Sequence, residues 1–202
     1  FVEEQMKAAR EALFKASDSQ LDFVHKRDDK LDAVHRDVSR YLIHMMRQPN
    51  MEPEAGRFLS LIQIVNHIEH IGDLLDKNIA PLASKRILYG TRFSPEGGKE
   101  LDDLFLRVAN DLSALFIAIA TTDQETLAAI RRHRSELDDY ARSLLVAHLH
   151  RLQEGSRDSL DTSSIHVDLI NYLLRIEFHI SHIAGLAIEM SRENGEAAKQ
   201  TT

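Results

Sequence analysis

The stretch VNHIEHIGDLLDKNIA, Val65–Ala80, places acidic side chains beside a run of isoleucines and leucines. At 100° per residue, the apolar residues of this segment fall on one stripe of an α-helix. Glu69, Asp73 and Asp76 follow one edge of that stripe. Carboxylates at the border of a buried face need a cationic partner, because burial and neighbouring like charges both disfavour the ionised form. The stretch therefore predicts a core helix whose acidic edge either binds a metal ion or is neutralised by basic side chains.

The composition is typical of an all-α protein with a sizeable core. The 202 residues are 43% hydrophobic and 28% charged, with eight glycines and four prolines. Helical periodicity recurs along the chain, whereas the alternation expected of strands does not. The absence of cysteine excludes disulfides and thiolate metal sites. A net charge of −7 argues against binding to nucleic acid or to anionic membrane surfaces.

Helical patterning and the positions of glycine and proline predict six helices. Pro81 predicts a kink or an early stop near the end of the third helix. The segment EGSRDSLDTSS, after the fifth helix, is expected to be a loop, and the tail 193–202 is expected to be disordered. The six helices span roughly Val2–Ala16, Gln20–Met46, Ala55–Lys85, Lys99–Ala120, Gln124–Gln153 and Ile165–Arg192.

The helix lengths run short, long, long and then repeat, which indicates internal duplication. A constant offset places Leu21 on Leu127 and Val24 on Ile130, and a similar offset places Glu69 on Glu177. We therefore predict a single domain, 1–202, built as a six-helix bundle from two three-helix repeats, at about 1–90 and about 97–192. The longest apolar run, Ala114–Ala120, is too short to span a bilayer.

The second predicted helix carries an acidic edge of the same kind as the third. Asp28 and Asp32 flank its apolar stripe at i,i+4 spacing, as Glu69 and Asp73 do on the third helix. Two antiparallel helices would bring these edges together as a cluster of four carboxylates. A multivalent cation would relieve the repulsion, and carboxylate oxygens suit Mg, Mn, Fe or Zn.

The segment HIEHIGDLLDKNIAPLA resembles the signature helix of the PhoU family, in which an E-x-x-x-D pattern precedes N-I-A. DDKLDAVHRDVSRYL resembles the other acidic helix of that family. DLINYLLRIEFHISHIA, Asp168–Ala184, is most similar to the PhoU-like region at the C-terminus of sodium/phosphate cotransporter-type membrane proteins. The positions that match the signature are Glu69, Gly72, Asp73, Asn78, Ile79 and Ala80.

This resemblance implies a function in the control of phosphate uptake and no enzymatic activity. It implies iron or zinc, as a multinuclear cluster or a single ion, on Asp28, Asp32, Glu69 and Asp73. The implied partners are the membrane transporter portion of the same chain, or a phosphate transport system, with inorganic phosphate sensed indirectly. The expected location is the cytoplasm, tethered to the inner face of the membrane. The start at Phe1 rather than Met is expected of a piece of a longer protein, and long amphipathic helices make a homodimer plausible.

The second repeat departs from this pattern. Asp28 corresponds to Arg134 and Asp73 to Ser181, so that only Asp138 and Glu177 remain. We expect this second site to be degenerate and empty, with Arg134 neutralising the remaining acids through a salt bridge.

Two alternatives to a metal-binding regulator follow from the same residues. If Lys77 or Arg36 neutralises the acidic edges, the chain is a metal-free helical adaptor. A ferritin-like di-metal enzyme would instead need E-x-x-H pairs on two helices, and these are missing. The pairs in HIEH, His67 and His70, and in HISH, His179 and His182, point away from the core stripe and are expected to be surface or packing histidines.

Overall fold

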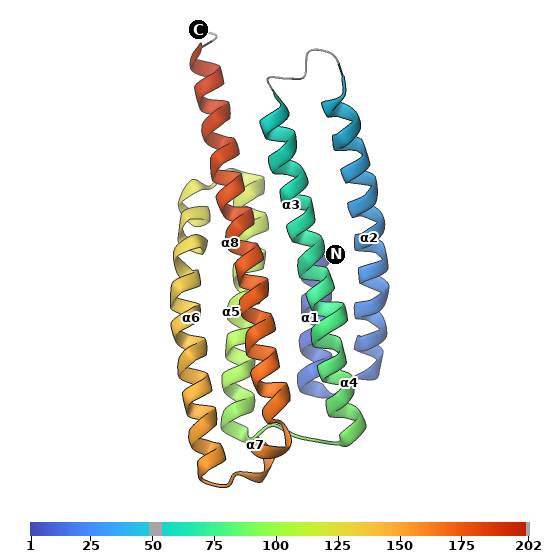
Figure 1. The fold of residues 1–202 in the computed structure, drawn as a ribbon, viewed down its shortest axis with the longest axis vertical. Helices are drawn as coiled ribbons and strands as arrows, with labels where there is room; N and C mark the ends of the chain where they lie inside the picture. Colours follow the sequence, from blue (N-terminus) through green and yellow to red (C-terminus); the bar gives the residue numbers. More distant parts are fainter. Residues whose placement is uncertain (49–53, 201–202) are drawn as a thin grey trace.

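The structure is a computed structural model that describes residues 1–48 and 54–200, with side chains described as far as residue 193. Nearly all of the described chain is helical, and no strand occurs in these ranges. Figure 1 shows long helices running roughly side by side along the longest axis of the molecule. The predicted all-α class is confirmed.

The first half consists of two antiparallel helices followed by one long helical rod. A π-helical turn interrupts the rod just before Pro81 without ending it. Inside a regular α-helix, a proline ring clashes with the carbonyl group four residues earlier and has no N–H to donate. The wider π-helical turn accommodates the Pro81 ring without ending the helix. Of the kink or early stop expected at Pro81, the early stop does not occur, and the predicted continuation of the helix past Pro81 to Lys85 is extended to Tyr89. The elements are α1 (Val2–Lys15), α2 (Asp18–Met46), α3 (Ala55–Asp73), η2 (Leu74–Ile79) and α4 (Ala80–Tyr89).

The second half repeats the order of a helix pair and a final long helix. The segment expected to be a loop contains a short helix, because the side chain of Ser156 caps it by accepting from the backbone N–H of Ser159. The last helix continues beyond Arg192 to Gln200, where a disordered tail was expected; residues 201–202 lie outside the described chain. The elements are α5 (Pro95–Thr121), α6 (Gln124–Gln153), α7 (Arg157–Asp161) and α8 (Ser163–Gln200).

Tight turns reverse the chain between neighbouring helices. Gly90 ends α4 at φ 61°, a left-handed conformation in which a side chain is strained. Ser94 then begins α5 by accepting from the backbone N–H of Gly97, with Pro95 in the first turn. Asp123 begins α6 by accepting from the backbone N–H groups of Glu125 and Thr126. The turn at Asp123 makes α5 and α6 an antiparallel pair, whereas the segment after Gly90 leads from the first three-helix unit to the second.

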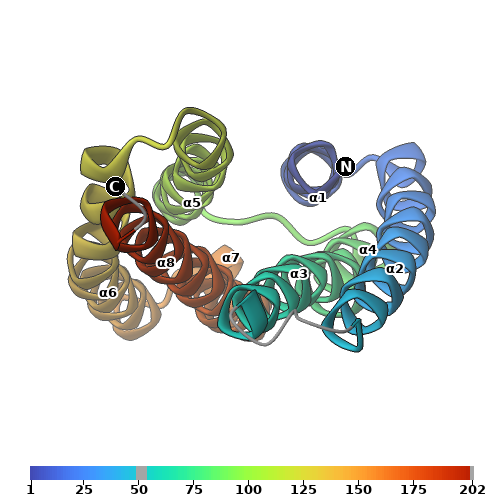
Figure 2. The same cartoon turned by 90° about the horizontal axis from the view of Figure 1, so that it is seen from above.

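The two halves form two three-helix units that share one core. Figure 2 shows α1, α2 and the rod of α3 and α4 on one side, and α5, α6 and α8 on the other. The units meet where α3 packs on α8 and α1 packs on α5. The predicted six-helix bundle of two repeats is confirmed, with α7 as a short addition.

Helix α5 is long and apolar enough to cross a membrane by length and composition alone. In the bundle, Phe105 and most of its leucines pack in the shared core, whereas Leu106, Ile117 and Ile119 are exposed. The fully buried side chains are Leu101, Leu104, Phe105, Val108, Leu112 and Leu115. One face of this helix therefore belongs to the core of the bundle.

Candidate metal centre

Three of the four predicted carboxylates converge between α2 and α3. Asp28 and Asp32 lie one turn apart on α2, and Asp73 is the last residue of α3. One ligand atom from each lies within 4.8 Å of those of the other two. The cluster follows from the antiparallel packing of α2 on α3, which brings the two acidic edges together.

Asp28 is the most buried of the three, with 5% of its surface exposed. Its Oδ1 accepts from Gln5 Nε2 of α1 at 3.2 Å, and the same nitrogen lies 3.3 Å from the carbonyl oxygen of Gly72. Burial raises the pKa of Asp28 to about 6, and the charges of Asp76, Asp32 and Asp73 add to this effect, whereas Gln5 opposes it. The ionised form of Asp28 is therefore disfavoured in this cluster, and a bound cation would stabilise it.

Basic side chains already contact this acidic edge. Lys77 Nζ pairs with Asp73 Oδ1 one turn along the rod, and His25 Nδ1 pairs with Asp76 Oδ1. The hydrogen bond to Asp73 raises the pKa of Lys77. The Lys77 side chain is 55% exposed, so that solvent screens this pair. The neutralisation by Lys77 that the sequence left open is thus present at one of the three acids.

Glu69, the fourth predicted ligand, is not part of this group of three. Contacts between the helices pair His25 with Asp76 and His35 with Asn66, which sets Glu69 level with Asp32 on the facing helix. The Glu69 carboxylate is instead turned toward His70, with Oε2 3.7 Å from Nε2. The sequence placed Glu69 on the correct edge but could not fix the direction of its side chain.

The second repeat holds a buried carboxyl group without a hydrogen bond. Glu177 is 0% exposed, and neither of its carboxyl oxygens has a partner. Burial raises its pKa to about 9, and Asp111 raises it further, whereas Arg134 opposes the shift. Within α5–α8 as far as residue 193, Arg134 forms no ion pair and instead lies over the ring of Phe178, 4.7 Å from its centroid. The expected salt bridge from Arg134 is therefore wrong.

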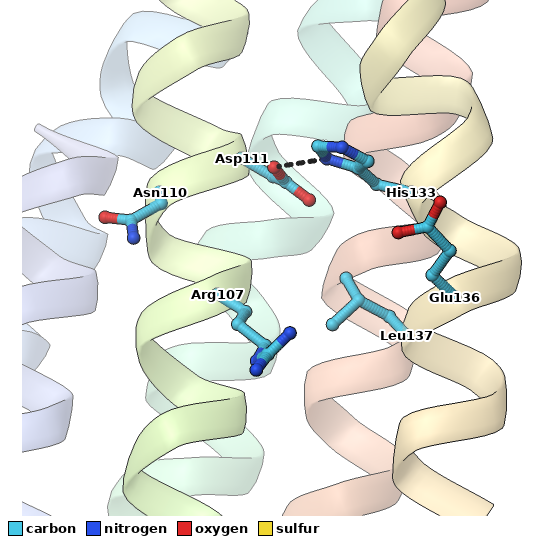
Figure 3. Close-up of a pocket in the computed structure, with 6 residues that line it drawn as sticks. All are labelled: Arg107, Asn110, Asp111, His133, Glu136 and Leu137. Carbon is cyan, nitrogen blue, oxygen red and sulfur yellow. Dashed lines mark hydrogen bonds and ion pairs between the residues drawn. The ribbon is translucent and has the colours of Figure 1, made fainter.

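A surface pocket of about 290 Å³ opens near this region, between α5 and α6. Figure 3 shows Asp111 and His133 facing each other across it, with Nδ1 3.3 Å from Oδ1. Its charged groups have both signs, so that the pocket does not select an anion. Its lining residues are Arg107, Asn110, Asp111, His133, Glu136 and Leu137.

A second group of potential ligands was missed by the sequence analysis. His67 and His70 of α3 meet His179 and His182 of α8, although both pairs were expected to be separate surface or packing histidines. Burial lowers the pKa of His67, and the neighbouring imidazoles lower it further. Burial also lowers the pKa of His179 to about 4, and the neighbouring imidazoles and Arg175 add to this shift. The available signal was the same i,i+3 spacing of two histidines on the last long helix of each repeat.

The sequence and fold of this chain are similar to those of several known proteins. The PhoU domain model matches residues 1–81. Proteins named "Putative inorganic phosphate export protein YjbB" from Escherichia coli K12 and Salmonella typhimurium are each 23% identical, over 171 and 173 residues. These matches cover 85% and 86% of this chain but 32% of each relative, so that the chain spans about a third of their length.

The crystal structure of PhoU from Pseudomonas aeruginosa superimposes with a TM-score of 0.85. The match covers 95% of this chain and 90% of that chain at 21% sequence identity, which shows the fold. Residues 1–81 therefore resemble the PhoU domain, and the chain as a whole has the fold of PhoU.

Proposed function

We propose that this chain is a PhoU-type regulatory domain of a sodium-dependent phosphate transport protein, held at the inner face of the membrane. The observation that carries the proposal is the match along 85% of the chain to relatives named for inorganic phosphate export. The match covers only 32% of those relatives, which leaves room for a transport portion. Their name favours export, whereas the resemblance found in the sequence pointed to uptake.

The proposal is tested in the full-length protein that carries this domain. Cells that express the protein without residues 1–202 should transport radiolabelled phosphate at a rate that no longer responds to the phosphate supply. A full-length protein with normal membrane levels and unchanged regulation after this deletion would overturn the proposal. Replacing sodium with potassium in the same assay tests the sodium dependence separately.

The proposal includes a carboxylate metal site at Asp28, Asp32, Glu69 and Asp73. Three of these acids converge, Glu69 lies level with Asp32, and the buried Asp28 has a raised pKa. The fit is to a hard or borderline cation held by oxygen atoms, with iron or zinc as the candidates. Such an ion would supply positive charge. The carboxylates would then bridge α2 and α3, making the shape of the first repeat dependent on metal.

Elemental analysis of untagged protein tests this site. Wild-type protein should contain more iron or zinc than the double variant Asp28→Asn, Asp73→Asn, by about one ion per chain. Asp29→Asn is the matched control, because Asp29 is an exposed neighbour on the same helix. Equal metal content in the double variant and in the control would remove the carboxylate site from the proposal.

A metal-free helical adaptor is the second candidate. The contact of Lys77 with Asp73 favours it, because a lysine ammonium can offset part of the acidic charge without a metal ion. In that case chelation should leave the unfolding temperature unchanged. Asp28→Asn should then raise the stability at neutral pH, since it removes a buried and repelled carboxylate.

A further inference from the structure

Two histidine pairs from different repeats meet across the seam of α3 and α8. The ligand nitrogens of His67, His70 and His179 all lie within 4.8 Å of one another. His67 Nδ1 lies 2.8 Å from His179 Nδ1, and the ring of His70 lies 5.2 Å from that of His179, centroid to centroid. The i,i+3 spacing places both α3 rings on one face of the helix, so that they approach α8 together.

This convergence is unusual for histidines that serve only to pack. Two Nδ1 atoms in contact can share one hydrogen, so that one ring donates and the other accepts. The third ring adds a further nitrogen beside them without a carboxylate in the group. Three imidazole nitrogens this close together match the ligand set of a transition-metal site.

We infer that His67, His70 and His179 form a binding site for a borderline divalent metal ion such as Zn²⁺, separate from the carboxylates between α2 and α3. Imidazole ligands favour Zn, Cu, Ni or Co over Mg or Ca. Three protein ligands leave a fourth position open, and His70, with 54% of its side chain exposed, lies where solvent can reach it.

Two further side chains, Glu69 and His182, lie beside the three proposed ligands. The Glu69 carboxylate lies 3.7 Å from His70 Nε2, where it can orient the ring. His182 directs Nδ1 to the carbonyl oxygen of Phe178 at 3.0 Å, and its ring lies 5.4 Å from that of His67, centroid to centroid. That hydrogen bond leaves Nε2 of His182 with its lone pair, so that this nitrogen is a candidate for the fourth ligand.

Metal binding here would connect the two repeats. His67 and His70 belong to the first repeat and His179 to the second, and α3 packs directly on α8. An ion that binds both helices in the native protein and not the unfolded chain raises the unfolding temperature, increasingly so as the free ion concentration exceeds the Kd. This inference goes beyond the proposed function and does not depend on it.

The test uses the full chain, stripped with chelator and titrated with Zn²⁺ and with Co²⁺. We expect one tight equivalent of Zn²⁺, a visible Co²⁺ absorption band of tetrahedral nitrogen coordination and a higher unfolding temperature. Removing His70 or His179 as His70→Ala or His179→Ala should weaken Zn²⁺ binding by at least about 100-fold, since even outer partners of ligands contribute about 10–100-fold. His70→Ala is safe for folding because the side chain is half exposed.

Two controls separate this site from the rest of the chain. His150→Ala removes an exposed histidine on α6 and should bind Zn²⁺ as wild type does. The variant Asp28→Asn, Asp73→Asn should keep the tight equivalent and the Co²⁺ band, even if the carboxylate site fails. Zn²⁺ affinity that is equal in His70→Ala, His179→Ala and His150→Ala would overturn the inference, as would binding lost only in the aspartate variant.

Discussion

At the scale of the residue, Gly72 sets how closely α3 approaches the helices that hold Asp28. A Cβ atom built at Gly72 would collide with the Leu31 side chain and lie 3.1 Å from Asp28 Oδ1. We predict that Gly72→Ala lowers the free energy of unfolding by about 1–3 kcal/mol, as overpacking a core does. Urea unfolding measures it. Close packing against Leu31 and Asp28 thus explains why a glycine occupies position 72 of the signature segment.

Gly56→Ala is the matched control for this prediction. Gly56 lies on the same helix, and a Cβ atom there would meet nothing within 4 Å. Because alanine restricts the unfolded chain without a clash, this change should stabilise the protein by about 0.5–1 kcal/mol. Equal effects of the two substitutions would show that Gly72 does not mark a close approach.

At the scale of the element, a stacked pair of histidines pins the start of α8 against α6. The rings of His148 and His166 lie 4.1 Å apart at 16°, and His148 Nε2 contacts Ser163 Oγ at 3.0 Å. Burial lowers the pKa of His166 to about 3 and also lowers that of His148, with Arg151 adding to both shifts. Folding therefore keeps both rings neutral in a range where the unfolded chain protonates them.

The sign of the pH dependence follows directly. Between pH about 6.5 and about 3 the unfolded state binds protons that the native state does not, so that stability falls as the pH falls through this window. Replacing His166 as His166→Phe should reduce this slope by up to about 1.4 kcal/mol per pH unit. Urea titrations at pH 5, 6 and 7 measure it, with His150→Phe as the exposed control. An unchanged slope would mean that His166 is protonated in the native protein.

The same scale shows how far the sequence reaches. Helical periodicity predicted the bounds of α6 correctly, because its amphipathic pattern continues along the whole of Gln124–Gln153. Helical periodicity did not predict the π-helical turn η2, since the backbone conformation before Pro81 depends on packing against α1 and α8. The acidic edges were predictable from 100° steps, whereas the turn of Glu69 toward His70 was a choice of side-chain rotamer that helical steps do not contain.

At the scale of the whole molecule, the two repeats share a core that neither completes alone. Phe14 of α1 lies edge-on to Phe105 of α5, with ring centroids 6.2 Å apart. Arg10 of α1 forms a two-pronged ion pair with Asp102 of α5 at 2.6 and 2.7 Å. Residues 1–81, which match the family model, therefore depend on α5 and α8 for much of their buried surface.

This shared core predicts that the first repeat is a poor independent unit. A fragment of residues 1–90 should unfold more than about 10 °C below the intact chain, since each kcal/mol lost lowers the Tm of a domain of this size by about 4–8 °C. Mixing it with a fragment of residues 91–202 should restore helicity and raise the Tm, because the mixture rebuilds the seams of α1 with α5 and of α3 with α8. Circular dichroism during heating measures both effects. A fragment of residues 1–90 as helical and as stable as the intact chain would mean that the duplicated halves fold as separate domains, and that their contacts form only after folding.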